Sequence, residues 1–123
     1  MKDLLYIFIG GGVGSTARYI VSSYTQKMWN INSFPVGTFV VNVLGCFIIG
    51  FLIAYFTKVD NSLKYLLITG FCGGFTTFST FSAENYSLWQ QQEYGTLAVY
   101  ILLSIILGLA AVVLGMKSEI VLH

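Results

Sequence analysis

One stretch decides the fold of this chain: Gly70-Phe71-Cys72-Gly73-Gly74-Phe75-Thr76-Thr77-Phe78-Ser79-Thr80-Phe81-Ser82-Ala83-Glu84. It lies in a run without charged residues from Tyr65 to Ala83, about the length of a helix that crosses a hydrocarbon core of ~30 Å. Adjacent glycines and β-branched threonines weaken a helix locally. Non-helical backbone survives in a bilayer only where protein buries it or where it lines water. The stretch therefore predicts a membrane helix that is broken near Gly73–Thr76 and lines a path for a small solute.

The rest of the composition also predicts an all-α integral membrane protein. Apolar residues make up 56% of the 123 residues and charged residues only 9%, against roughly 25% charged residues in soluble domains. Four spans fit the pattern, at about 4–26, 36–57, 64–90 and 95–116, in a single membrane domain. The net charge of +1 gives no basic surface for nucleic acid.

The lysines favour one orientation of these spans. An even number of spans puts both termini on one side, which gathers Lys2, Lys58, Lys64 and Lys117, whereas the opposite loops hold Lys27 alone. Positive residues favour the cytoplasmic side. The count predicts cytoplasmic termini, with insertion in both directions left open.

Enzyme chemistry has no support in the sequence. The segment from Gly12 to Ala17 fits a G-x-G-x-x-A dinucleotide pattern, but no acidic residue occurs between Asp3 and Asp60 to hold a ribose. The only histidine is His123, and no pair of carboxylates lies within one helical turn. We therefore expect a protein that is not an enzyme.

A few polar side chains fall inside the predicted spans and are candidates for function. Arg18, Asn42 and Glu84 lie in the first, second and third spans, and Thr38 shares a helix face with Asn42. Charges in a membrane are costly and tend to face a cavity or each other. A structural ion pair or snorkelling is the alternative for the two charged residues, and hydrogen bonding between helices is the alternative for the asparagine.

The third span offers a lining suited to an anion. Phe75, Phe78 and Phe81 recur at every third position, and Thr77, Ser79, Thr80 and Ser82 supply hydroxyl groups between them. The edge of a phenylalanine ring is electropositive, so ring edges, hydroxyl groups and an amide N–H can face an anion without a fixed charge that would trap it. Arg18 would raise the local anion concentration at an entrance. The competing interpretation is that the rings face lipid and the hydroxyl groups satisfy backbone carbonyls.

Glycine spacing suggests close contact between helices. Gly10 with Gly14, and Gly70 with Gly74, are small residues one helical turn apart, which lets backbones approach closely. Four short helices bury little surface against one another, so we expect a tight oligomer. Packing of helices within one chain is the alternative.

Three blocks of this sequence resemble the signature blocks of the CrcB/Fluc fluoride channels. They run from Gly10 to Tyr19, from Pro35 to Gly45 and from Gly70 to Glu84, and their order and spacing fit over nearly the whole chain. The resemblance implies an antiparallel, dual-topology dimer of four-helix subunits, with the third helix broken at the membrane centre. It also implies fluoride-selective, passive export that lowers fluoride in the cytoplasm.

The resemblance further implies roles for individual residues. Phe78 and Phe81 would line the pore, and Asn42 would donate to the permeating ion. Ser79 and Thr80 would continue a polar track, joined by Tyr100 on the fourth helix. Backbone carbonyls of Gly73 and Thr76 from both subunits would hold one structural Na⁺. Arg18 and Glu84 match charged positions of the motif.

The partners implied are fluoride, membrane lipid and a second subunit, in the cytoplasmic (plasma) membrane of a bacterium. That subunit is either another copy or a paralogous chain. A small proton-coupled multidrug exporter is one alternative function, but such a protein needs a carboxylate in its first helix, where this chain has Arg18 and only Asp3 at the edge. A membrane subunit without transport of its own is the other alternative.

Overall fold

Four helical spans make up the part of the chain that the computed structural model describes, residues 1–29 and 33–122. They run from Lys2–Met28, Val36–Lys58, Tyr65–Gln90 and Tyr94–Leu122, and each is long and apolar enough to cross a membrane. The first three match the prediction closely, whereas the fourth continues to Leu122 instead of ending near residue 116. The linker residues Asn30 and Asn32 and the terminal His123 lie outside the described residues.

Six elements form these spans. They are α1 (Lys2–Met28), α2 (Val36–Lys58), the π-helix η1 (Tyr65–Cys72), α3 (Gly73–Phe75), α4 (Ser79–Gln90) and α5 (Tyr94–Leu122). The third span is therefore composite: η1, α3 and α4 follow one another along it. The sequence did not predict the π-helix, which carries hydrogen bonds from residue i to i+5 and is uncommon outside functional sites.

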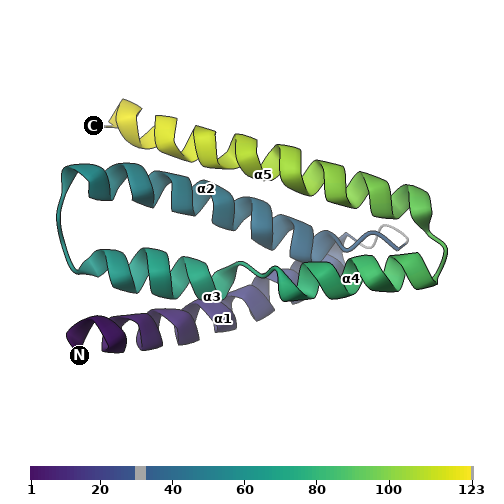
Figure 1. Cartoon of the computed structure of the whole chain (residues 1–123), viewed down its shortest axis with the longest axis horizontal. Coiled ribbons are helices and arrows are strands. Elements are labelled where there is room, and N and C mark those ends of the chain that lie inside the picture. Colours follow the sequence, from purple (N-terminus) through teal and green to yellow (C-terminus); the bar gives the residue numbers. More distant parts are fainter. Residues whose placement is uncertain (30–32, 123) are drawn as a thin grey trace.

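The spans lie along one another in a bundle, with both termini at the same end as the turn between α2 and η1 (Figure 1). This confirms the prediction that an even number of spans places the termini together. Helices α2 and α5 run side by side in the same direction, and α1 packs against η1 and α3. Much of the outer surface is apolar: Phe8, Leu109 and Val121 are among its exposed side chains, as expected of residues that face lipid.

Glycines bring α1 against η1 and α3. A Cβ atom added to Gly70 would lie 3.0 Å from the Cα atom of Gly10, and one added to Gly10 or Gly14 would collide with the backbone of η1. Such contacts replace the hydrophobic force that helices lack in lipid. These glycines serve packing within one chain, which is the alternative to the oligomer contact suggested by their spacing.

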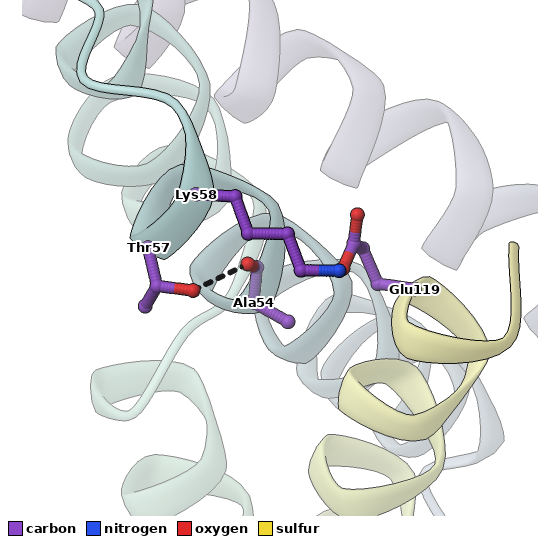
Figure 2. A network of polar contacts seen from close by, with 4 residues as sticks. All are labelled: Ala54, Thr57, Lys58 and Glu119. Carbon is purple, nitrogen blue, oxygen red and sulfur yellow. Dashed lines mark hydrogen bonds and ion pairs between the residues drawn. The ribbon is translucent and has the colours of Figure 1, made fainter. Parts of the chain in front are cut away.

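Helices α2 and α5 are joined by a second glycine contact and by an ion pair. A Cβ atom on Gly50 or Gly115 would collide with a backbone carbonyl of the opposite helix. At the end that holds the termini, Lys58 Nζ lies 3.1 Å from Glu119 Oε1 (Figure 2), and the Glu119 side chain is fully buried. The pair ties the last turns of α5 to α2, which explains why the fourth helix outlasts its apolar run.

The break in the third span lies at Thr76–Phe78, slightly later than the sequence predicted. Gly73 is helical (φ −63°, ψ −37°), whereas Thr76 is extended (φ −82°, ψ 158°). The glycines stay helical because Gly74 packs against the backbone of Gly11. The chain leaves the helix one residue after α3, where side chains offer its backbone other partners.

Candidate functional site

The break is held open by the side-chain amide of Asn42. Its Nδ2 donates to the carbonyl of Thr77 at 3.1 Å, and its Oδ1 accepts from the amide of Thr77 at 3.0 Å. Thr77, in the middle of the break, thus has both backbone groups satisfied by one side chain of α2, as backbone groups within a membrane must be. An asparagine amide has two N–H groups, so one remains for another acceptor.

Hydroxyl groups complete the ends of the break. Thr76 Oγ1 donates to the carbonyl of Cys72 at 2.9 Å, and Thr77 Oγ1 accepts from the amide of Thr80 at 3.2 Å. The first bond closes the end of α3 and the second satisfies an amide in the first turn of α4. Both threonine hydroxyls therefore bond to backbone groups; the competing interpretation of the sequence expected bonds to carbonyls, whereas Thr77 accepts from an amide.

Arg18, on α1, holds the backbone just before the break. Its Nε donates to the carbonyl of Gly74 at 3.1 Å, so α1 and α2 each hold one carbonyl near the break. The cavity described next does not include Arg18 among its lining residues. Within one chain, the arginine therefore supports the backbone rather than the lining.

A cavity of about 380 Å³ opens beside the break. Side chains from α2, the broken span and α5 line it, and none of them carries a charge; they are Asn42, Cys46, Ile49, Thr76, Thr77, Phe78, Phe81, Ser104 and Ile105. We call it the inner cavity. The ring centroids of Phe78 and Phe81 lie 6.0 Å apart, so the two predicted pore residues and the predicted amide meet in one place.

A second polar cluster lies where α2, α4 and α5 meet. Thr38 Oγ1 donates to Glu84 Oε2 at 2.9 Å, and the Tyr100 hydroxyl donates to Glu84 Oε1 at 2.9 Å. Glu84 also lines a polar cavity of about 580 Å³, which we call the mouth cavity; its other lining residues are Gln26, Ser33, Phe34, Pro35, Ser87, Leu88 and Gln91. Most of its lining residues belong to α4 and to the segment before α2, and these parts of the chain lie at the end of the bundle opposite the termini (Figure 1).

Packed aromatic rings lie between the residues that line the two cavities. Phe81, which lines the inner cavity, has its ring centroid 4.9 Å from that of Tyr100, whose hydroxyl reaches Glu84. Residues of the mouth cavity, the carboxylate cluster and the inner cavity therefore follow one another along the bundle. The Lys58–Glu119 pair lies at the other end, far from this series (Figures 1 and 2).

The carbonyls of Gly73 and Thr76 suit a small cation. Throughout the described residues, neither oxygen accepts a hydrogen bond from the chain, and a Cβ atom on Gly73 would meet nothing within 4 Å. Carbonyl oxygens are hard ligands of the kind that bind alkali and alkaline-earth ions. Two such oxygens without a partner are the type of ligand that the predicted Na⁺ would need, and no other atom of the described part of the chain fills the space beside Gly73.

A family model for CrcB-like proteins, described as "CrcB-like protein, Camphor Resistance (CrcB)", matches residues 5–116 of this sequence. The chain belongs to the CrcB family. Proteins named fluoride-specific ion channel FluC are similar over most of their length: one from Azobacteroides pseudotrichonymphae is 49% identical over 94% of each chain. One from Phocaeicola vulgatus is 45% identical over 94% of this chain and 96% of its own. One from Ignicoccus hospitalis is 40% identical over 94% and 93%.

Within this CrcB chain, the predicted site residues divide between several places. Asn42, Phe78 and Phe81 share the inner cavity, while Thr38, Glu84 and Tyr100 form the carboxylate cluster. Ser79 is exposed and Thr80 half-buried, and neither lines the two cavities.

The sequence prediction missed Cys46 and Ser104 as lining residues. The signal that could have found them is helical spacing: Cys46 follows Asn42 by four residues, and Ser104 follows Tyr100 by four, so each shares a face with a predicted residue. Ser104 Oγ is buried and has no hydrogen-bond partner within residues 1–29 and 33–122. A hydroxyl in that state leaves a donor available beside the inner cavity.

Proposed function

We propose that this CrcB protein is a fluoride-selective channel that lets fluoride leave the cytoplasm passively across the plasma membrane. The single observation that carries the proposal is the inner cavity, where two phenylalanine rings, a free amide N–H of Asn42 and the hydroxyl of Ser104 converge without any charged side chain. Such a lining replaces water around an anion without trapping it. The relatives named as fluoride-specific channels supply the identity of the anion.

A second subunit of opposite orientation completes the pore in this proposal. Phe78 is 78% exposed although it lines the inner cavity, so a single chain would leave half of the pore facing lipid. Gly12 and Gly73 have open space where a Cβ atom would stand, so packing within the chain does not require glycine at either position. A partner backbone lying against this face would require it.

A structural Na⁺ belongs to the same assembly. The carbonyls of Gly73 and Thr76 would supply half of its ligands, and the same pair from the partner would supply the other half. Its charge would lie at the break, where it attracts an anion without binding it directly.

Fluoride efflux from liposomes tests the function. Purified protein in liposomes loaded with fluoride should release it to an ion-selective electrode, and equivalent liposomes loaded with chloride should release almost none. Comparable chloride release, or no fluoride release, would reject fluoride selectivity. Proton-coupled drug efflux without halide flux would favour the exporter, and no flux of any kind would favour a subunit without transport.

A pair of phenylalanine variants tests the lining. Phe81→Ile should reduce fluoride efflux at least tenfold because it removes the ring edge while it keeps an apolar side chain of similar bulk. Phe8→Ile is the matched control, since Phe8 lies on α1 and is 78% exposed. Equal efflux from the two variants would contradict the role given to Phe81.

A further inference from the structure

Glu84 stands between the two cavities. Its carboxylate lines the mouth cavity, and its partner Tyr100 packs against Phe81 of the inner cavity. Thr38, Tyr100 and this carboxylate therefore lie between the residues of the two cavities, where an anion travelling along the bundle would meet them. The proposed function alone does not explain why a negatively charged side chain lies there.

The carboxylate occupies the hydroxyl donors that an anion would need there. A hydroxyl group has a single hydrogen to donate, and both Thr38 and Tyr100 direct theirs to Glu84, at 2.9 Å each. The two donors come from different helices and each meets its own oxygen of the carboxylate, so both could donate to another anion in its place. The pair of donors is taken up by a side chain of the protein itself.

Within residues 1–29 and 33–122, no lysine or arginine forms an ion pair with this carboxylate. Among the described residues, no lysine or arginine nitrogen lies within 4.0 Å of the Glu84 oxygens, and the mouth cavity has no basic residue in its lining. The hydroxyl pair is thus the main anchor of the carboxylate. An anchor of two hydrogen bonds can be exchanged for those of another anion at little net cost.

The mouth cavity offers the displaced carboxylate a second resting place. Gln26 lines the same cavity, and its Oε1 is engaged by the amide of Gly37 at 3.1 Å. Its two amide hydrogens have no partner in the described part of the chain and can donate to an oxyanion. Glutamate has three rotatable side-chain bonds, and a cavity of about 580 Å³ beside it leaves room for that rotation.

We propose that Glu84 is a tethered competitor of the permeating anion: it occupies the hydroxyl pair of Thr38 and Tyr100, and fluoride enters the inner cavity by displacing it. The inference rests on the proposed function and adds a specific step to it. A site that is free only a fraction of the time binds its ligand more weakly by that fraction. If the hydroxyl pair is free roughly one tenth of the time, Glu84 raises the fluoride concentration for half-maximal flux about tenfold.

The experiment measures initial efflux from liposomes against internal fluoride concentration. Glu84→Ala should lower the half-saturating concentration about tenfold, and Glu84→Gln should lower it less, because an amide keeps one acceptor oxygen but has lost the charge. Glu93→Ala is the matched control, because Glu93 is an exposed glutamate directly before the first residue of α5. It should leave the curve unchanged, and a shift equal to that of Glu84→Ala would assign the effect to long-range charge and overturn the proposal.

A double-mutant comparison separates displacement from a structural role. Thr38→Val removes a donor from fluoride and from Glu84 alike, so in the wild-type background it should change the half-saturating concentration less than about twofold. In the Glu84→Ala background it should raise that concentration about tenfold, because only fluoride then uses the hydroxyl. If Thr38→Val changed the half-saturating concentration by the same factor in both backgrounds, the proposal would be overturned.

The outcomes also distinguish this step from the function on which it rests. Absence of fluoride flux in the wild-type protein would refute the proposed function. Wild-type flux with an unchanged half-saturating concentration in Glu84→Ala would refute the tethered competitor alone. If Glu84→Ala fails to fold, Glu84→Gln with and without Thr38→Val gives the same comparison.

Discussion

Replacing Asn42 with alanine should release the backbone at the break. The change removes both hydrogen bonds to Thr77, at 3.1 and 3.0 Å, and leaves the amide and carbonyl of that residue without a partner. Each unsatisfied buried group costs about 1–3 kcal/mol, so the variant should lose about 2–6 kcal/mol of unfolding free energy. The loss exceeds that of the bonds themselves because lipid offers no substitute donor or acceptor.

Two measurements on the same preparation test this reasoning. The unfolding midpoint in detergent should fall, and fluoride efflux should fall by at least a hundredfold, because the ring of Phe78 follows directly on the residue that Asn42 holds. Asn85→Ala is a matched control: Asn85 is an asparagine of the third span, on α4, and its Oδ1 is buried without a hydrogen-bond partner within the described residues. It should leave stability nearly unchanged. An Asn42→Ala protein as stable as the Asn85→Ala protein would refute the argument.

Three further predictions follow from the packing and the ions. Gly50→Ala should destabilise the protein by about 1–3 kcal/mol because its Cβ atom would meet backbone of α5, whereas Gly95→Ala, with nothing within 4 Å, should be neutral or stabilising in thermal unfolding. Lys58→Met should cost about 1–3 kcal/mol, less than a fully buried pair, since the Lys58 side chain is 46% exposed while that of Glu119 is buried; unchanged stability to chemical denaturant would contradict this. Exchange of Na⁺ for a large organic cation during purification should lower the unfolding temperature, and restored Na⁺ should recover it; equal curves in both salts would argue against the ion.

The sequence was informative where the membrane constrains the chain most. Four spans, the common side of the termini and the broken third helix all follow from runs without charge and from the glycine–threonine block, because a bilayer tolerates few alternatives. Asn42, Phe78 and Phe81 line one cavity, but their roles come from the family resemblance and stay predictions. Each of these results depends on local pattern or on a short motif.

What the sequence did not predict depends on contacts between helices. The break falls at Thr76–Phe78 because Asn42 offers its amide to Thr77, and no pattern within the third span contains that partner. Likewise, nothing in the sequence around Glu84 indicates the two hydroxyl donors on other helices that hold it. The end of α5 could not be placed because Glu119 is charged in the sequence but buried and paired in the fold.

Arg18 and Asn42 hold the main chain from two different helices, the first just before the break at Gly74 and the second within it at Thr77. A backbone held in this way resists sliding of either half of the third span. Sliding would break one of these hydrogen bonds and leave a carbonyl without a partner inside the membrane. Movement during transit is then left to side chains, which change rotamer in picoseconds to nanoseconds, whereas collective helix motions take microseconds to milliseconds. The broken helix is thus held as a fixed frame, and rotation of the lining side chains is the motion that these hydrogen bonds leave free.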